Sequence, residues 1–164
     1  VENTPNDVPS VINFGHFEAH GATNVVPDKA FVKGTFRTMD EDWRKKAKDQ
    51  LLEIAARISK EYNGQIKLII SHGYPFLKND IELTHAVRDL AKLNFGQEKV
   101  HDLPMRMTSE DFAYYSQLVP VCFFRLGVRN EEEGIIHGLH HPKFDIDPNS
   151  IKKGVQMFVS IVFS

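Results

Sequence analysis

Apolar and polar residues alternate along the first part of the chain with the two-residue period that is typical of β-strands. This alternation predicts three strands, over residues 9–18, 30–37 and 65–71. Between the second and third strands, apolar residues recur at helical spacing and predict a helix over residues 40–62, with a capping box before it and Asn63-Gly64 after it. The order strand, strand, helix, strand predicts an antiparallel sheet with a helix on one face.

Helical spacing dominates the second part of the chain. It predicts helices over residues 79–96, 109–118 and 147–162. The short middle helix is expected to bury Phe112, Tyr115 and Leu118. The last helix is expected to bury an apolar stripe made of Ile151, Val155, Phe158, Val159 and Val162. Residues 121–127 are almost continuously apolar, which predicts a strand covered on both faces. One such strand is too little sheet for an independent layer, so we expect the remainder of a larger domain.

Length and composition narrow the class of protein. The 164 residues carry 20 Lys+Arg against 22 Asp+Glu, so no basic excess favours nucleic acid or an anionic membrane as a partner. No apolar run reaches the roughly 18 residues of a membrane span. Cys122 is the single cysteine, which excludes an internal disulfide and favours a reducing, cytoplasmic location. The chain begins without Met, from which we expect that residues upstream were removed.

The densest cluster of candidate metal ligands lies in residues 136–147, where His137, His140 and His141 stand close to Asp145 and Asp147. Imidazoles next to carboxylates suit zinc, because a neutral ring nitrogen binds the ion while an acid fixes the tautomer. The histidines lack the i, i+4 spacing of a helical ligand pair. A solvated loop therefore stays open as an alternative, and spacing alone does not decide.

A second candidate site joins the turn Thr23-Asn24 to Arg37 at the end of the second strand. Arginine offers a planar fork for a carboxylate, and an asparagine amide can donate to a developing oxyanion. Each residue also has a plainer interpretation, turn geometry for Asn24 and a solvated strand end for Arg37. On the residues alone, the plainer interpretation is favoured.

Taken together, the sequence blocks resemble the metal-dependent amidohydrolases and peptidases that include N-acyl-amino-acid amidohydrolase, hippurate hydrolase, the plant auxin-conjugate hydrolases and, more remotely, glutamate carboxypeptidase. Six blocks in order carry the resemblance: Gly21–Asp28, Gly34–Arg37, Gly73–Pro75 with Asn79-Asp80, Thr108–Tyr115, Pro120 with Phe123–Gly127, and Leu139–Asp145. They cover nearly the whole chain, so a chance match is very unlikely.

The resemblance implies an α+β or α/β fold built from parts of two domains. Enzymes of this kind have an α/β catalytic domain that holds two divalent metal ions, usually zinc or manganese, and a smaller ferredoxin-like lid that mediates dimerisation. Residues 1–75 resemble part of the lid, and residues 76–164 resemble the C-terminal part of the catalytic domain. The N-terminal half, with the other metal ligands and the catalytic glutamate, has no counterpart in this chain.

The resemblance also assigns residue roles. His140 matches the last metal ligand, Asn24 the lid asparagine that reaches a substrate, and Arg37 the arginine that binds the carboxylate of the amino-acid moiety. Glu110 and Asp111 lie in a matched block without an assigned role. This branch usually has a cysteine ligand, whereas Cys122 falls in the predicted buried strand and is interpreted as an apolar core residue.

These roles imply part of an enzyme that cleaves the amide bond of N-acyl amino acids or short peptides with a metal-activated water, the chain alone being inactive. The expected partners are such a substrate and a second copy bound through the lid. One alternative is a non-catalytic lid and dimerisation module that acts only in self-association. Another, an independent zinc protein that uses His137, His140 and His141, ignores five of the six blocks.

Overall fold

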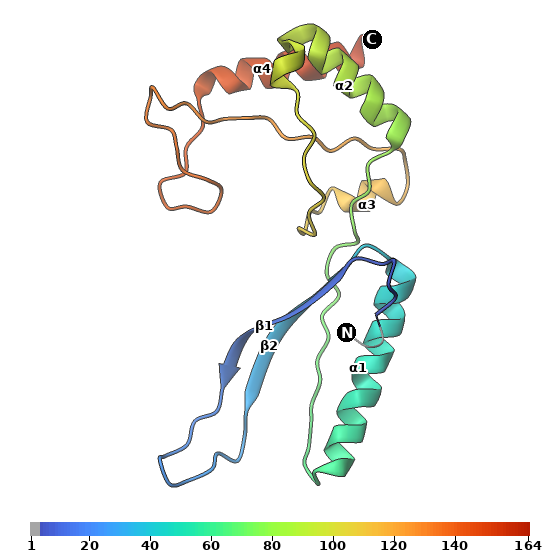
Figure 1. The fold of residues 1–164 in the computed structure, drawn as a ribbon, viewed down its shortest axis with the longest axis vertical. Coiled ribbons are helices and arrows are strands. Elements are labelled where there is room, and N and C mark those ends of the chain that lie inside the picture. Colours follow the sequence, from blue (N-terminus) through green and yellow to red (C-terminus); the bar gives the residue numbers. More distant parts are fainter. Residues whose placement is uncertain (1–3) are drawn as a thin grey trace. The chain divides into compact units, whose positions relative to one another are not determined.

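The computed structural model describes residues 4–164, a mixed α and β structure with one two-stranded sheet among the described residues (Figure 1). Its elements are β1 (Ser10–Glu18), β2 (Phe31–Thr38), α1 (Glu41–Glu61), α2 (Ile81–Phe95), the 3-10 turn η1 (Gln97–Lys99), α3 (Ala113–Ser116) and α4 (Pro148–Val162). The chain divides into two units. The first runs to Leu77 and includes Met105–Tyr114, and the second combines Lys78–Pro104 with Tyr115–Ser164.

β1 and β2 form the predicted antiparallel hairpin, from the pair Ser10 and Thr38 to the pair Glu18 and Phe31. The register shifts between Phe14 and His16, so that Gly15 forms a bulge. Strict alternation would place Phe14 and Phe17 on opposite faces of the strand. Because the bulge adds one residue, both lie on the face that carries the even-numbered residues of β2.

α1 packs on that face near its own first turn, and this confirms the predicted helix. Trp43 and Ala47 are its buried residues, and the Trp43 ring meets the Phe36 ring edge-on with centroids 6.4 Å apart. The side chain of Asp40, rather than that of Thr38, caps the helix by accepting a 2.6 Å hydrogen bond from the Trp43 backbone N–H. The predicted stop is confirmed too, since Asn63 has φ 50° and the Gly64 N–H donates to the Ser59 carbonyl.

The predicted strand over residues 65–71 is wrong as a hydrogen-bonded strand. These residues run without helix or sheet assignment after α1, and none of their backbone groups bonds another backbone group of the described chain. The segment that follows is tied to α1. Lys48 Nζ lies 2.6 Å from His72 Nδ1, and Arg44 donates to the Tyr74 carbonyl at 2.8 Å. A strand needs a neighbour to pair with, and periodicity does not supply one.

α2 and α4 pack against each other in the second unit, and both confirm predicted helices. Asp80 caps α2 and Asp147 caps α4. The Asn94 amide donates to the Ser160 hydroxyl at 3.0 Å, and Met157 is buried. Among the described residues, no helix combines the length and the hydrophobicity that a membrane span requires.

Three expectations for the second part of the chain are wrong. Residues 121–127 run extended without a sheet partner in the described chain, and Phe123 and Leu126 are exposed. α3 has four residues and buries Ala113, whereas Tyr115 and Leu118 are exposed. The expected apolar stripe of α4 is exposed along its length, from Ile151 to Val162. Most of these apolar side chains stay exposed in the described chain, although the Phe158 ring of α4 lies 5.8 Å from the Phe124 ring.

The extended segment is nevertheless held in place by the residues just before α2. The Asp80 N–H donates to the Val121 carbonyl at 2.8 Å. The Asn79 side chain acts like a strand neighbour, accepting from the Phe123 N–H at 2.8 Å and donating to the Phe123 carbonyl at 2.9 Å. Val121 is buried, whereas Cys122 is only half-buried and is not among the buried core residues, so its predicted place in the core is not confirmed.

Candidate functional site

Asn24 lies at the tip of the connection between β1 and β2. Ala22 and Val25 pair with each other through two backbone hydrogen bonds of 3.3 and 3.1 Å, which leaves Thr23 and Asn24 as a two-residue turn. A Cβ on Gly21 would meet the Val25 carbonyl oxygen at 2.6 Å, so this tight return of the chain requires glycine. The Asn24 amide is thereby presented at an exposed turn.

Arg37 lies at the opposite end of the hairpin, on the face that points away from α1. Its guanidinium donates a 2.5 Å hydrogen bond to the Met107 carbonyl, from the segment Met105–Tyr114 that belongs to the same unit. No local sequence pattern predicts this contact, because 70 residues separate the two partners. One side of the guanidinium fork is engaged by this carbonyl, and a planar guanidinium carries further donors for a carboxylate.

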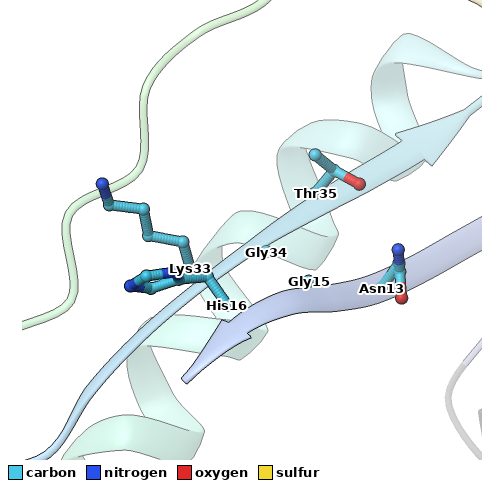
Figure 2. A pocket seen from close by; sticks show the side chains of 6 residues that line it. All are labelled: Asn13, Gly15, His16, Lys33, Gly34 and Thr35. Carbon is cyan, nitrogen blue, oxygen red and sulfur yellow. The ribbon is translucent and has the colours of Figure 1, made fainter. Parts of the chain in front are cut away.

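Polar side chains gather on the same outer face around the bulge. Figure 2 shows Lys33 and His16 next to each other from neighbouring strands, with Asn13 and Thr35 farther along the same strands, beyond Gly15 and Gly34. Together with Gly15 and Gly34 they line a shallow hollow of about 210 Å³. His16 Nε2 lies 2.6 Å from Glu18 Oε1, and Lys33 Nζ stands 5.1 Å above the Phe31 ring. The two-residue period of β2 places Lys33 and Arg37 on the same outer face. His16 lies on this face only because the bulge at Gly15 shifts the register of β1.

His140 occupies a strained turn. Its φ is +68°, in the left-handed region that glycine and asparagine favour, and the His141 N–H closes the turn on the Gly138 carbonyl at 3.2 Å. The side chain is exposed. Non-glycine residues held in this region cost of order 1–3 kcal/mol and cluster at functional sites. The conformation thus marks His140, among the three histidines of this loop, as the one presented on a strained backbone.

The other two histidines pack on each other. The rings of His137 and His141 are stacked with centroids 4.1 Å apart and planes 2° apart. His141 Nδ1 accepts a hydrogen bond from the Lys143 N–H at 3.1 Å. A neutral imidazole that accepts through Nδ1 carries its proton on Nε2, so neither nitrogen is free to bind a metal. This argues against the zinc reading that used all three histidines.

A complete metal centre does not fit the described residues. Between residues 4 and 164 there is no group of three or more His, Cys, Asp or Glu side chains that could hold a metal ion. His140 is at most a single ligand to an ion whose other ligands come from elsewhere. Asn24, Arg37 and His140 are also not brought together by any contact within a unit, since His140 belongs to the second unit.

Glu110 and Asp111 begin the turn that leads into α3. The Ala113 N–H donates to the Glu110 carbonyl and the Tyr114 N–H to the Asp111 carbonyl. The Glu110 carboxylate accepts from the Phe112 N–H at 3.5 Å. These contacts support the turn, and they assign neither acid a chemical role.

The comparison with family models shows to which family this chain belongs. The model of peptidase family M20/M25/M40 matches residues 6–164, nearly the entire chain. The chain is therefore a member of this family.

Two curated relatives are uncharacterized hydrolases from staphylococci. The protein of Staphylococcus aureus (strain N315) is 31% identical over 156 residues, which are 93% of this chain and 40% of the relative. The protein of Staphylococcus saprophyticus is 35% identical over 133 residues, 80% of this chain and 34% of the relative. The chain thus spans about two-fifths or less of the length of these relatives.

Two solved structures share the fold. A protein of methicillin-resistant Staphylococcus aureus, provisionally described as an aminohydrolase, matches with a TM-score of 0.73 and 25% identity over 98% of this chain and 41% of its own. The Bacillus subtilis protein YXEP, described as a dinuclear metal-binding peptidase of family M20, matches with a TM-score of 0.72 and 24% identity over 93% of this chain and 41% of its own.

Proposed function

We propose that this chain is part of a metal-dependent hydrolase that cleaves the amide bond of N-acyl amino acids or short peptides. The observation that carries the proposal is the family match over residues 6–164. The described relatives are hydrolases, one of them a dinuclear metal-binding peptidase, which supports two divalent metal ions in the complete enzyme. Zinc and manganese are the proposed ions. The chain covers about two-fifths of its relatives, so we propose that it is inactive alone.

In this proposal Arg37 binds the free carboxylate of the substrate. It stands on the polar outer face of the hairpin, where its guanidinium already donates to a carbonyl oxygen. A hydrogen bond to a charged group is worth about 1.5–3 kcal/mol. Since 1.4 kcal/mol is a factor of ten, loss of Arg37 should weaken substrate binding by about 10- to 100-fold.

We propose that Asn24 positions a substrate carbonyl. The substrate it contacts is not the one that Arg37 of the same chain binds. Within β2, about 20 Å of strand separates Phe31 from Arg37. Asn24 lies beyond Phe31, at the tip of the hairpin, so it is farther than this from Arg37. An N-acyl amino acid spans about two residues of extended chain, roughly 7 Å. The separation supports a homodimer in which Asn24 serves the site of the partner copy.

His140 is proposed to donate one imidazole ligand to the metal centre. Its exposed side chain on a left-handed turn supports this role, and the hydrogen bond at His141 Nδ1 excludes its neighbour. The remaining ligands are proposed to lie in the N-terminal half of the complete enzyme. In this proposal, residues 1–75 are part of the lid domain and residues 76–164 are the C-terminal portion of the catalytic domain. The lid is proposed to be ferredoxin-like and the location cytoplasmic.

A second candidate function is a non-catalytic lid module that self-associates. The exposed strand edges of the first unit favour it, since an uncovered edge pairs readily with another chain. The two candidate functions require different assemblies. The enzyme needs further polypeptide and metal, whereas the module needs only copies of this chain.

Native mass spectrometry of the protein purified from its source, with added zinc or manganese, tests the proposal. A denatured control gives the chain mass, which is 18.7 kDa for residues 1–164 alone. Additional polypeptide, two bound ions and hydrolysis of N-acetyl or N-benzoyl amino acids are expected. An assembly of 18.7 kDa chains without metal or hydrolysis would overturn the enzyme in favour of the module.

Arg37→Ala tests the substrate assignment within the active assembly. It should raise KM for carboxylate substrates about 10- to 100-fold and leave amidated substrates unaffected. Arg129→Ala is the matched control, because Arg129 pairs with Glu131 at 3.0 Å on an exposed surface. An unchanged preference for carboxylates over amides in Arg37→Ala would remove the assignment.

A further inference from the structure

The C-terminal end of α1 carries the single Asn-Gly pair of the chain, and the proposed function does not use it. Asn63 has φ 50°, in the left-handed region, and directly follows the helix cap Tyr62. The Gly64 N–H donates to the Ser59 carbonyl at 3.0 Å, and the Asn63 N–H donates to the Lys60 carbonyl at 3.5 Å. This pair of hydrogen bonds is the Schellman motif, which closes a helix on a left-handed residue.

Ser59 adds a side-chain bond to this turn. Its hydroxyl donates to the Gly64 carbonyl at 2.6 Å, so both backbone groups of Gly64 are bonded to the same residue. These two bonds are called the Ser59–Gly64 clamp. Residues 60–64 are exposed where α1 passes into the extended segment that follows it (Figure 1). The clamp therefore holds the Gly64 nitrogen in a turn that water reaches.

An asparagine that precedes glycine can cyclise, because glycine has no Cβ to hinder the approach of its nitrogen. Hydroxide removes the Gly64 amide proton, the nitrogen forms a bond to Asn63 Cγ, and the Cγ–Nδ2 bond breaks. The leaving nitrogen takes a proton from water and departs as ammonia. Water then breaks one of the two C–N bonds of the cyclic imide and leaves aspartate or isoaspartate. Nothing is oxidised or reduced in either step.

The clamp acts on the first of these steps. Loss of the Gly64 amide proton is also the event that hydrogen exchange measures, and exchange requires that the bond to the Ser59 carbonyl opens. While this bond is closed, the Gly64 nitrogen keeps its proton and is withheld from Asn63 Cγ. Cyclisation and exchange therefore share the same opening of the turn.

We propose that Asn63 is a deamidation site whose rate is set by the opening of the Ser59–Gly64 clamp. Reaction places a carboxylate at the C-terminal end of α1, where the helix dipole disfavours negative charge. The isoaspartate product also adds one carbon to the backbone of the turn that the clamp closes. Both changes weaken the clamp, so conversion releases the junction between α1 and residues 65–71 irreversibly. The proposal holds whether or not the complete protein is a hydrolase.

Peptide mass spectrometry of the incubated chain tests the proposal. The folded chain and the chain unfolded in urea are held at the same mildly alkaline pH, and an isoaspartate-specific methyltransferase identifies isoaspartate. In urea, Asn63 should react before every other asparagine. In the folded chain its reaction should be slower by the same factor by which exchange of the Gly64 amide is slowed. After conversion, that amide should exchange faster, while α2 amides keep their rates.

Asn149 is an internal control in the same samples. The Ser150 N–H, which would have to attack Asn149, donates to the Asp147 carbonyl at 2.9 Å, and Ser150 is 4% exposed. Asn149 should therefore stay unmodified in the folded chain.

Ser59 variants test the clamp itself. Ser59→Ala removes the hydroxyl bond to Gly64, and the net strength of one such bond corresponds to an acceleration of about two- to tenfold in both deamidation and Gly64 exchange. Ser59→Thr keeps the hydroxyl and should stay close to the parent rate. Ser71→Ala, which removes an exposed serine from the segment after the turn, is the matched control and should also keep the parent rate.

Gly64→Ala separates the attack from the opening of the turn. A Cβ on Gly64 meets no atom within 4 Å, so the turn accommodates the methyl group, which hinders the nitrogen. This variant should slow the reaction in urea as well as in the folded chain. Ser59→Ala should change the rate in the folded chain only, because the clamp is absent in urea.

Four outcomes would overturn the proposal. One is deamidation of Asn63 as fast in the folded chain as in urea while the Gly64 amide is protected, and another is no deamidation while that amide exchanges freely. The third is an equal rate in the parent chain and Ser59→Ala. The fourth is unchanged exchange of the Gly64 amide after conversion. None of these readouts depends on hydrolase activity, so failure here and failure of the proposed function are distinguishable.

Discussion

Ser10→Ala should destabilise the first unit far more than its half-exposed position on the hairpin suggests. The Ser10 hydroxyl donates to Thr38 Oγ1 at 2.9 Å and accepts from the Trp43 indole N–H at 3.0 Å. Thr38 is 3% exposed and Trp43 8%. One hydroxyl therefore satisfies two buried polar groups, one on β2 and one on α1, and links the first strand to both.

The expected loss follows from this double role. A buried donor or acceptor left without a partner costs about 1–3 kcal/mol. The Thr38 hydroxyl, which accepts from Ser10, loses a donor but can still donate its own proton, whereas the Trp43 N–H can only donate and has a fixed direction. We therefore expect a loss of about 2 kcal/mol, the cost of one such group. Ser10→Thr keeps the hydroxyl on a β-branched residue suited to a strand, and it should stay within about 0.5 kcal/mol of the parent chain.

Urea unfolding followed by tryptophan fluorescence measures the effect. Trp43 is the single tryptophan, so its emission reports the first unit without interference from the second. For an m-value of about 1–2 kcal/mol per M, Ser10→Ala should lower the midpoint by about 1 M or more. A Ser10→Ala midpoint equal to that of the parent chain would refute the reasoning, as would an equal loss in Ser10→Thr.

Two further substitutions test local geometry. Gly34→Ala should cost about 1–3 kcal/mol, because its Cβ would lie 2.5 Å from the Asn13 carbonyl oxygen, whereas Gly127→Ala, with nothing within 4 Å, should be near neutral; equal urea midpoints would contradict this. His140→Gly should be about 1 kcal/mol more stable than His140→Ala, because only glycine adopts φ +68° without strain, and thermal unfolding that ranks the two variants the other way would be inconsistent with a strained turn.

The three long helices, α1, α2 and α4, could be predicted from the sequence because their signals are local. Asp40, Asp80 and Asp147 each precede an apolar helical pattern, and each accepts a hydrogen bond from a backbone N–H in the first turn. Caps and helical spacing act over a few residues, so their effect survives in any context that tolerates the helix. The hairpin also followed from alternation, apart from the bulge at Gly15.

The residues of the candidate site were predicted from the resemblance of sequence blocks rather than from local structural rules. Asn24, Arg37 and His140 were assigned from their places in matched blocks. The contact of Arg37 with the Met107 carbonyl and the stacking of His137 on His141 had no local signal. The contact of Arg37 joins residues far apart in sequence. The stacking of the histidines depends on two successive turns, which the His141 N–H closes on the Gly138 carbonyl and the Phe144 N–H closes on the His141 carbonyl.

The sequence by itself determined α1, α2 and α4, the acidic residues before them and the turn at Thr23-Asn24, because backbone propensity and capping act within a few residues. Tertiary structure decided which apolar patterns became paired and covered. Residues 65–71 and 121–127 carry strand patterns but have no sheet partner in the described chain, and the apolar stripe of α4 is exposed there. Periodicity specifies which face of an element is apolar, whereas pairing and burial require a second surface whose position depends on the rest of the fold.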